Sequence, residues 1–392
     1  MHNIADIVKN HRLYGQFSEI KERLRAHQFV CWIAGGAVRD FLIGREVKEF
    51  DLVTDAGTEV LKAIFPEAVL VGESFGVIKI PCRNGGFFDL ATFREEADYV
   101  DGRRPSKVGS ATPTKDSIRR DFTINAMFWD DENRSLRDYQ GGRDDLEARV
   151  IRCVGDARVR FSEDHLRLFR LVRFAAQLGF RIDLEADREA RGLAGTLAKV
   201  SGERLWAELL KLESSSSLCR AYESDLFRLL MGQVFECPMT ENAAVSGDDL
   251  FLFLVRAYSG EDISERLKTR LKLSNRELKT YTLTKYLLER PTGGVEELFV
   301  ECEKSPAMAA RLDELLARGV MSAEIREKFA RFKTECPESL VVPSDLLGMI
   351  PNNQIGSEIS LIRTEQLRKK FTTKEQVLGY LKKKYADFNG KT

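Results

Sequence analysis

Two acidic residues one position apart, Glu49 and Asp51, are the part of this 392-residue sequence best suited to chemistry. The residues around them predict a strand over 50–54, and side chains at positions i and i+2 of a strand point to the same face. Two carboxylates on one rigid face suit Mg²⁺, which takes few protein oxygens and completes its shell with waters and substrate phosphates. Asp89, in a second strand-like run over 87–93, supplies a third oxygen ligand if the two strands pair.

An E-x-D tripeptide is common, and by itself it is more typical of a solvated strand face than of a metal site. A second feature changes this interpretation. Gly35 and Gly36 begin a G-G-A-V-R-D turn between a predicted strand over 29–34 and a predicted helix over 37–43. Glycine lets the backbone approach a phosphate closely, and a helix N-terminus favours its negative charge. A glycine turn followed closely by paired carboxylates therefore predicts a site for phosphates and a metal.

The elements that must position these residues change in character near residue 150. Strand-like runs separated by glycine-rich turns come first, over 29–34, 50–54, 69–71, 77–81, 87–93 and 123–128. From residue 162 onward apolar residues recur every three or four positions, which predicts helices. The sequence thus predicts an α+β head at 1–150, followed by all-helical parts at 151–245 and 246–392.

Charge and cysteine content limit which binding partners and which cellular compartment fit this sequence. Lys and Arg total 61 and so do Asp and Glu, so net charge identifies no partner, and any nucleic-acid surface must come from local clusters. The seven cysteines are scattered without a C-x-x-C pair, which argues against a disulfide framework or a zinc site and favours a reducing cytoplasm. No apolar run reaches the length of a signal peptide or a membrane span, so we expect a soluble cytoplasmic protein with no membrane partner.

Six segments together resemble the class II tRNA nucleotidyltransferase and poly(A) polymerase family, and bacterial CCA-adding enzymes most closely. They are WIAGGAVRDFLIGREVKEFDLVTD (32–55), FDLATFREEADYVDGRRPSKV (88–108), IRRDFTINAMFWD (118–130), DYQGGRDDLEARVIRCVGD (138–156), RFSEDHLRLFRLVRFAAQLGF (160–180) and SGERLWAELLKL (201–212). The resemblance implies a polymerase-β-like nucleotidyltransferase head with a mixed sheet and helices. It also implies a helical neck that selects the nucleotide and a helical body and tail that bind tRNA.

The resemblance implies that Glu49, Asp51 and Asp89 are the catalytic carboxylates, with Glu49 and Asp51 among the ligands of two Mg²⁺ ions. The family motif carries Asp where this sequence has Glu49, which keeps the charge but adds a methylene. In a near-octahedral Mg²⁺ site that extra length can shift one ion. A catalytically weakened RNA-binding relative therefore stays open as an alternative.

The nucleotide contacts are implied in the same way. The residues assigned to the incoming CTP or ATP are Gly35, Gly36, Arg39, Arg120, Asp121, Asn125, Asp164, Arg167, Arg170 and Arg173. Backbone amides and guanidinium groups donate to phosphate oxygens, and Asp121 would accept a bond from a ribose hydroxyl. Asp164 and Arg167, three apart on one face of a predicted helix, would read the edge of cytosine or adenine. Glu203 and Arg204 would hold that helix by ion pairs.

Three features narrow the function within the family. The stretch at 72–76 (GESFG) lacks the paired arginines of the related poly(A) polymerases, which favours CCA addition. The loop at 94–105 is intact, as expected of an enzyme that adds the terminal adenosine and not only the cytidines. None of the four histidines is followed by Asp, so the metal phosphohydrolase domain of some relatives is not expected.

Cations are concentrated near the C-terminus, at Arg368, Lys369, Lys370 and Lys374 and again at 382–384. Such a cluster would bind the phosphates of the acceptor and T arms of tRNA without regard to sequence. We therefore expect a template-independent enzyme that adds CCA to tRNA from CTP and ATP by two-metal in-line transfer, releasing pyrophosphate. An A-adding or poly(A)-type tailing enzyme stays open as an alternative, and no obligate protein partner is expected.

Overall fold

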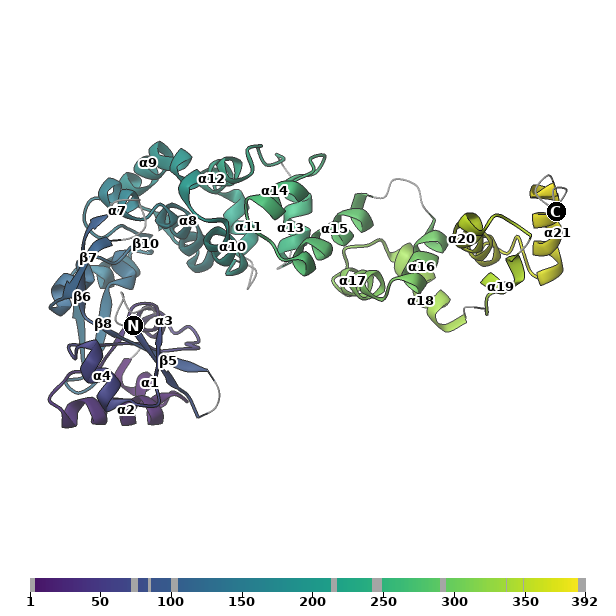
Figure 1. Cartoon of the computed structure of the whole chain (residues 1–392). Helices are drawn as coiled ribbons and strands as arrows, with labels where there is room; N and C mark the ends of the chain where they lie inside the picture. The colour runs from purple at the N-terminus through teal and green to yellow at the C-terminus, as the bar shows by residue number, and fades with distance from the viewer. Residues whose placement is uncertain are drawn as a thin grey trace. The chain divides into compact units, whose positions relative to one another are not determined.

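The computed structural model describes residues 4–71, 77–83, 86–99, 105–212, 217–241, 249–289, 294–335, 337–347 and 349–386, without the side chains of 96–99, 105–110, 324 and 335. The chain divides into two compact units, Met1–Ser274 and Asn275–Thr392 (Figure 1). The division expected at residues 150 and 245 is finer than this one and stays a prediction.

A seven-stranded mixed sheet forms the core of the head within the first unit. Its strand order is β3-β4-β5-β2-β1-β8-β9, with β2 and β5 parallel and the other neighbours antiparallel. The strands are β1 (Trp32–Ala34), β2 (Asp51–Thr54), β3 (Val69–Val71), β4 (Val77–Pro81), β5 (Phe87–Thr92), β8 (Met127–Asp130) and β9 (Ser135–Asp138). The expected α+β class is confirmed.

Several expected strands differ from the structure at their ends. The strand predicted at 29–34 begins only at Trp32, and the one predicted at 87–93 ends at Thr92. The first half of the strand predicted at 123–128 is wrong: Thr123–Asn125 forms a 3₁₀ helix (η2), and β8 begins only at Met127. The backbone of Thr123 donates to Arg152 (3.0 Å) and its hydroxyl donates to Asp145 (2.7 Å), so tertiary hydrogen bonds draw this segment out of the sheet. The strand predicted over 50–54 begins at Asp51, where its pairing with β1 starts.

Phe50, between the two candidate metal ligands, fixes their direction. It is buried (1% exposed), and its ring contacts those of His11, Phe17, Phe41 and Phe88 at centroid distances of 4.9–6.2 Å. Burying a phenylalanine stabilises a fold by roughly 1.5–3 kcal/mol. Because side chains alternate along an extended chain, this burial turns the carboxylates on either side of Phe50 away from the core.

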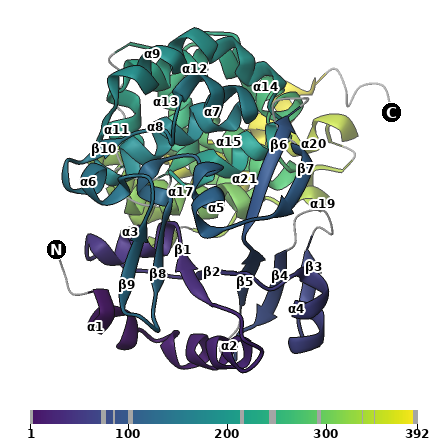
Figure 2. The same ribbon diagram turned by 90° about the vertical axis from the view of Figure 1, so that its left-hand side faces the viewer.

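Helices surround the sheet and continue beyond it. Those of the head are α1 (Ile4–Lys9), α2 (Tyr14–Ala26), α3 (Gly36–Leu42), α4 (Thr58–Ile64), α5 (Pro113–Ile118) and α6 (Gly142–Glu147). A separate hairpin of β6 (Arg94–Tyr99) and β7 (Pro105–Ser110) lies beside α5, as Figure 2 shows. The helix expected at 37–43 is confirmed as α3.

The remainder of the first unit is helical apart from a short parallel pair, β10 (Val150–Ile151) with β11 (Arg181–Ile182). Its helices are α7 (Ala157–Glu163), α8 (Leu166–Leu178), α9 (Leu184–Leu193), the 3₁₀ helix η3 (Ala194–Lys199), α10 (Gly202–Leu210), α11 (Ser217–Glu223), α12 (Asp225–Phe235), α13 (Leu250–Ala257) and α14 (Ser264–Thr269). Helix α8 packs against both α10 and α11, which brings residues far apart in sequence together.

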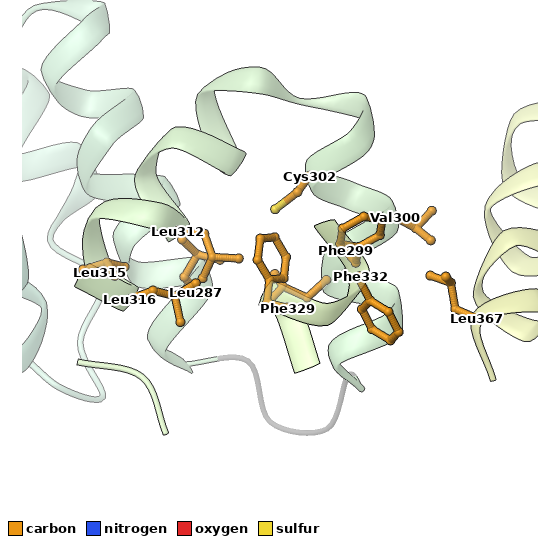
Figure 3. Packing of buried hydrophobic residues seen from close by; sticks show 11 residues of the cluster. Leu287, Phe299, Val300, Cys302, Leu312, Leu315, Leu316, Phe329, Phe332 and Leu367 are labelled. Atoms are coloured by element: carbon orange, nitrogen blue, oxygen red, sulfur yellow. The ribbon is translucent and has the colours of Figure 1, made fainter. Parts of the chain in front are cut away.

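The second unit is built from helices around two apolar clusters of its own, the larger of which is shown in Figure 3. They are α15 (Asn275–Glu289), α16 (Val295–Lys304), α17 (Pro306–Ala317), α18 (Ala323–Glu335), α19 (Pro343–Leu346), the 3₁₀ helix η4 (Asn352–Gln354), α20 (Ile355–Leu367) and α21 (Lys374–Lys384). In the larger cluster, Phe299 packs edge-on against Phe329 and Phe332 at centroid distances of 5.4 and 5.3 Å (Figure 3). No helix in the described ranges is long and apolar enough to cross a membrane.

Gly202, the first residue of α10, lies against the backbone at the end of α14. A Cβ at this position would sit 1.9 Å from the carbonyl oxygen of Arg270, whose guanidinium in turn donates to the carbonyls of Val200 (2.8 Å) and Leu197 (2.7 Å). We therefore expect Gly202→Ala to lower the free energy of unfolding by about 2–3 kcal/mol, because backbone must move to make room.

Gly15→Ala is the matched control, since a Cβ at Gly15 in α2 meets no atom within 4 Å. That substitution should leave stability unchanged or raise it slightly. Urea unfolding followed by tryptophan fluorescence reports on the first unit, because all three tryptophans (Trp32, Trp129 and Trp206) belong to it. Equal midpoints for the two variants would contradict the close contact.

Candidate active site

A cavity of about 500 Å³ lies in the first unit between the head sheet and the helices that follow it. Its lining residues are Gly35, Gly36, Arg39, Glu49, Asp51, Arg119, Arg120, Asp121, Asn125, Asp164, Arg167, Arg170, Arg173, Phe174 and Lys211. Every residue that sequence reasoning assigned to the nucleotide is in this set, although the residues span nearly 140 positions of the chain. Of the three expected catalytic carboxylates, Asp89 is not among the lining residues.

Asp51 and Asp89 lie on neighbouring strands, β2 and β5. These strands pair in parallel with Asp51 opposite Asp89, so the pairing on which the third ligand depended is present. Asp89 is held by Lys79 of β4, whose Nζ lies 2.7 Å from its Oδ1. Among the residues that the structure describes, no three His, Cys, Asp or Glu side chains are grouped to hold a metal ion. Glu49 and Asp51 therefore offer a two-carboxylate site, as Mg²⁺ prefers when substrate phosphates complete its shell.

The electrostatics of Asp51 fit a site for a divalent cation. Its side chain is open to the cavity, yet desolvation raises its pKa to about 6, with repulsion from Glu49 and Asp89 adding to the rise. Arg120 and Lys79 offset only part of this. Negative charge thus exceeds nearby positive charge at these carboxylates, and a bound cation would remove the imbalance.

The glycine turn lies directly beside the arginines. Gly35 has φ +67°, a conformation that suits glycine, and a Cβ there would lie 3.0 Å from Nη1 of Arg120. Arg39, on α3, donates through Nε and Nη2 to Asp40 (both 2.9 Å) and through Nη1 to the side-chain oxygen of Asn125 (2.6 Å). The turn and its arginines therefore form one wall of the cavity.

Asp121 is the most heavily bonded carboxylate of the cavity. Its Oδ1 accepts from the backbone of Phe122 (2.8 Å) and the amide of Asn125 (3.1 Å), and its Oδ2 accepts from Nε and Nη2 of Arg170 (2.8 and 2.6 Å). Burial would raise its pKa, but Arg170 and Asn125 lower the pKa well below its usual range. A ribose hydroxyl would have to share or displace one of these four donors.

Sequence reasoning placed Asp164 and Arg167 on one helix, and that expectation is wrong. Helix α7 ends at Glu163 and α8 begins at Leu166, with Asp164 extended (φ −145°, ψ 104°) between them. Its Oδ1 accepts from the backbone of Leu166 (3.1 Å), whose N–H would bond a backbone carbonyl in a continuous helix, and its Oδ2 accepts from Arg204 (2.7 Å). Both residues still line the cavity, because the break turns Asp164 toward it.

Arg167 is fixed by three acceptors. Nη1 donates to the carbonyl of Arg160 (3.0 Å) and to Glu163 (2.6 Å), and Nη2 donates to the carbonyl of Arg119 (2.8 Å). Arg204 forms the helix-holding ion pair that was expected of it, with Asp164, whereas Glu203 is exposed. The candidate base-reading pair is thus held in place by Arg204, Arg160, Glu163 and the backbone of Arg119.

Two buried carboxylates that support the arginines were missed. Glu208 of α10 (3% exposed) pairs with Arg173 (2.5 Å), Arg170 (3.4 Å) and Lys211 (2.8 Å). Asp116 of α5 (0% exposed) pairs with Arg119 (2.8 Å) and Arg120 (3.1 Å). The only signal for Glu208 was its position on the apolar side of a helix, because its main partners lie 35 and 38 residues away in sequence.

The cations expected to bind tRNA lie in the second unit. Arg368 pairs with Glu297 and Glu365, Lys370 pairs with Glu365, and Lys374 pairs with Asp345. Lys369 is exposed at the end of α20, as are Lys382 and Lys383 on α21, and none of these three has an ion pair with another described residue. The stretch at 72–76 and residues 100–104 of the loop at 94–105 lie outside the described residues.

The family model described as Poly A polymerase head domain matches residues 31–152, which contain the glycine turn and the Glu49–Asp51 carboxylates. A CCA-adding enzyme of Staphylococcus aureus is 35% identical over 271 residues, which cover 68% of this chain and 67% of that protein. The chain belongs to the family of CCA-adding enzymes.

Two further comparisons agree in fold or sequence. A Bacillus pumilus CCA-adding enzyme is 40% identical over 194 residues, 49% of this chain and 48% of that protein, so the chain matches about half the length of this relative. The crystal structure of a Bacillus stearothermophilus CCA-adding enzyme in complex with CTP has a TM-score of 0.73 and 23% identity, covering 97% of this chain and 100% of that one. This second likeness shows the fold.

The raised pKa of Asp51 has a consequence for stability. The folded protein binds this proton more tightly than the unfolded chain, so stability is lost as pH rises from about 4 to about 6. We expect Asp51→Asn to raise the unfolding temperature by a few degrees above pH 6 in metal-free buffer, and to have no effect below pH 4.

Asp89→Asn is the contrasting variant, because Asp89 has a cationic partner in Lys79 and removing its charge should not stabilise the fold. Thermal unfolding with chelator present, measured across pH 4–8, tests both expectations. A lower unfolding temperature for Asp51→Asn at pH 7 would mean that the carboxylate is not under repulsion.

Proposed function

We propose that this chain adds nucleotides to the 3′ end of tRNA without a nucleic-acid template, completing CCA from CTP and ATP with release of pyrophosphate. The observation that carries the proposal is the single cavity that gathers the Glu49–Asp51 carboxylates, the arginines beside Gly35 and the Asp164–Arg167 pair. Membership of the CCA-adding enzyme family supports the same reaction.

Each wall of the cavity suits one part of the reaction. Arg39 and Arg120 lie where they can donate to a triphosphate, which charge-assisted bonds from guanidinium groups bind well. Asp164 and Arg167 offer an acceptor and donors to a base edge, enough to distinguish cytosine and adenine from uracil and guanine. Glu49 and Asp51 would hold Mg²⁺, which supplies activation of the attacking 3′ hydroxyl and neutralises the leaving pyrophosphate. In the transfer, that hydroxyl bonds to the α-phosphorus as the bond to the β-phosphate breaks.

The RNA would be bound beyond the cavity. In this proposal the parts at 151–245 and 246–392 act as neck and as body with tail, and the cations near the C-terminus contact the acceptor and T arms. Lys369, Lys382 and Lys383 are exposed and ready for phosphate contacts, whereas Arg368, Lys370 and Lys374 would exchange acidic partners for phosphates. Six free cysteines in the described chain support a cytoplasmic setting.

Asp51→Ala tests the site. We expect it to reduce incorporation by at least about 10³-fold, because a metal ligand of the transferring centre is lost, while tRNA affinity stays within about threefold. The assay uses Mg²⁺, each nucleotide separately, and tRNAs that end before the first C, the second C and the final A. Glu59→Ala removes an exposed carboxylate of α4 outside the cavity and should act as wild type. Near-normal incorporation by Asp51→Ala would refute the assignment.

Glu49 decides between a working enzyme and a weakened relative. Because Glu49 precedes β2 rather than lying within it, its backbone can adjust to the longer side chain. We therefore expect Glu49→Asp to keep kcat/KM within about tenfold of wild type, and Glu49→Gln to lose at least about 100-fold through loss of the charged oxygen.

The same tRNA series measures both variants with Mg²⁺ and with Mn²⁺. A Glu49→Asp variant much faster than an almost inactive wild type would favour the weakened RNA-binding relative. Unlimited ATP incorporation by the wild type on unrelated RNA would instead favour a poly(A)-type tailing enzyme.

A further inference from the structure

Asp116 occupies a position that the proposed reaction does not by itself explain. It lies on α5, which begins with the Thr112 cap and Pro113, and its side chain is fully buried (0% exposed). Its two oxygens accept five N–H donors. Oδ1 accepts from the backbone of Arg94 (3.2 Å) and from Nε and Nη2 of Arg119 (2.9 and 2.8 Å), and Oδ2 accepts from Nε and Nη2 of Arg120 (3.2 and 3.1 Å).

Both arginines that Asp116 holds reach the cavity. Arg120 donates through Nη1 to the carbonyl of Asn125 (3.2 Å), and its guanidinium lies over the ring of Phe128 at 4.8 Å, beside the Gly35 turn. A guanidinium group keeps a fixed direction only while the carboxylate that it pairs with is itself held in place.

Arg119 connects Asp116 to Arg167. Its side chain is bound by Asp116, and its own carbonyl accepts from Nη2 of Arg167 (2.8 Å). A shift of Asp116 would therefore displace Arg167, the candidate base-reading residue, through the backbone carbonyl of Arg119. No other described carboxylate is bonded to both neighbouring arginines of this segment.

The third partner of Asp116 is the first residue of the β6–β7 hairpin. The backbone N–H of Arg94 donates to Oδ1, and Lys115 pairs with Glu95 across the same junction (2.7 Å). One buried carboxylate thus bonds to the first residue of this hairpin and to two arginines that line the cavity. Burial would raise the pKa of Asp116, but Arg120 and Arg119 lower it, so the carboxylate stays charged at neutral pH.

We propose that Asp116 is a positioning residue for nucleotide selection: it sets Arg120 against the glycine turn and, through the carbonyl of Arg119, sets Arg167 against the base. This inference rests on the proposed function. It assigns selectivity to a residue that touches neither substrate nor metal.

The test compares Asp116→Asn with Asp130→Asn in the full chain. Asp130 is also buried (1% exposed) and also accepts from an arginine, Arg137 (2.8 Å), but it does not line the cavity. We expect Asp116→Asn to lower the preference for CTP over UTP in kcat/KM on the order of tenfold, because Arg167 would shift by less than the roughly 1 Å that can cost about 10²-fold. Asp116→Glu should restore part of the preference. Asp130→Asn should lower thermal stability about as much as Asp116→Asn does, but should leave the preference unchanged.

A second measurement separates this inference from the proposed function. Calorimetric binding of CTP and of UTP reports the same preference without any turnover. If wild type incorporates no nucleotide, the proposed function is wrong, and the binding ratio still decides the role of Asp116. A binding and kinetic preference in Asp116→Asn equal to that of wild type would overturn the inference.

If Asp116→Asn does not fold, Arg119→Lys takes its place. Lysine keeps the charge but cannot form the forked pair with Asp116, so the carbonyl that holds Arg167 should shift. The same loss of preference, of at least threefold, is expected. Wild-type preference in a folded Arg119→Lys variant would be evidence against the proposal.

Discussion

The concentration of positive charge in one cavity is the constraint on which the rest of this structure depends. Six arginines line it: Arg39, Arg119, Arg120, Arg167, Arg170 and Arg173. Guanidinium groups this close repel one another, and partial burial removes the water that would screen them. Each arginine is therefore paired with a carboxylate, and three of these carboxylates, Asp116, Asp121 and Glu208, are themselves buried. The fold must bring those acids together from α5, from the segment that follows α5 and from α10 before the cavity can exist.

The negative charge of Glu49 and Asp51, elsewhere in the cavity, is not balanced in the same way. Glu49 and Asp51 have no comparable set of cationic partners, and the pKa of Asp51 rises to about 6 in response to burial and repulsion. Arginines that are already paired with acids can also donate to phosphate oxygens without a large rearrangement. Crowded carboxylates, by contrast, are stabilised most by binding a divalent cation. The arginines and the two carboxylates together are complementary to a metal-bound triphosphate, and this asymmetry supports the proposed reaction more strongly than either group alone.

Several features of the site could be predicted from local sequence. The common direction of Glu49 and Asp51 follows from their i, i+2 spacing, and the burial of Phe50 between them agrees with it. The turn follows from the paired glycines, and Gly35 adopts a φ of +67° there. The break before α8 could not be predicted in this way, because spacings of three and four residues fit a continuous helix. Asp164 leaves the helix to bond Leu166 and Arg204, and Arg204 is 40 residues away in sequence. The 3₁₀ turn at Thr123–Asn125 has a similar cause, since Arg152 and Asp145 compete with the sheet for its hydrogen bonds.

The sequence by itself determined which residues are candidates for the chemistry, because oxygen ligands, guanidinium groups and glycine turns are properties of residue type and short spacing. It also determined the α+β head and the helical remainder, since periodicity is local. Only the tertiary structure decided that Asp116 and Glu208 hold the arginines, that Asp89 is bonded to Lys79, and that Asp164 lies outside a helix. The physical reason is that a buried charge is stable only beside its partner, and these partners are supplied by elements that the chain brings together when it folds.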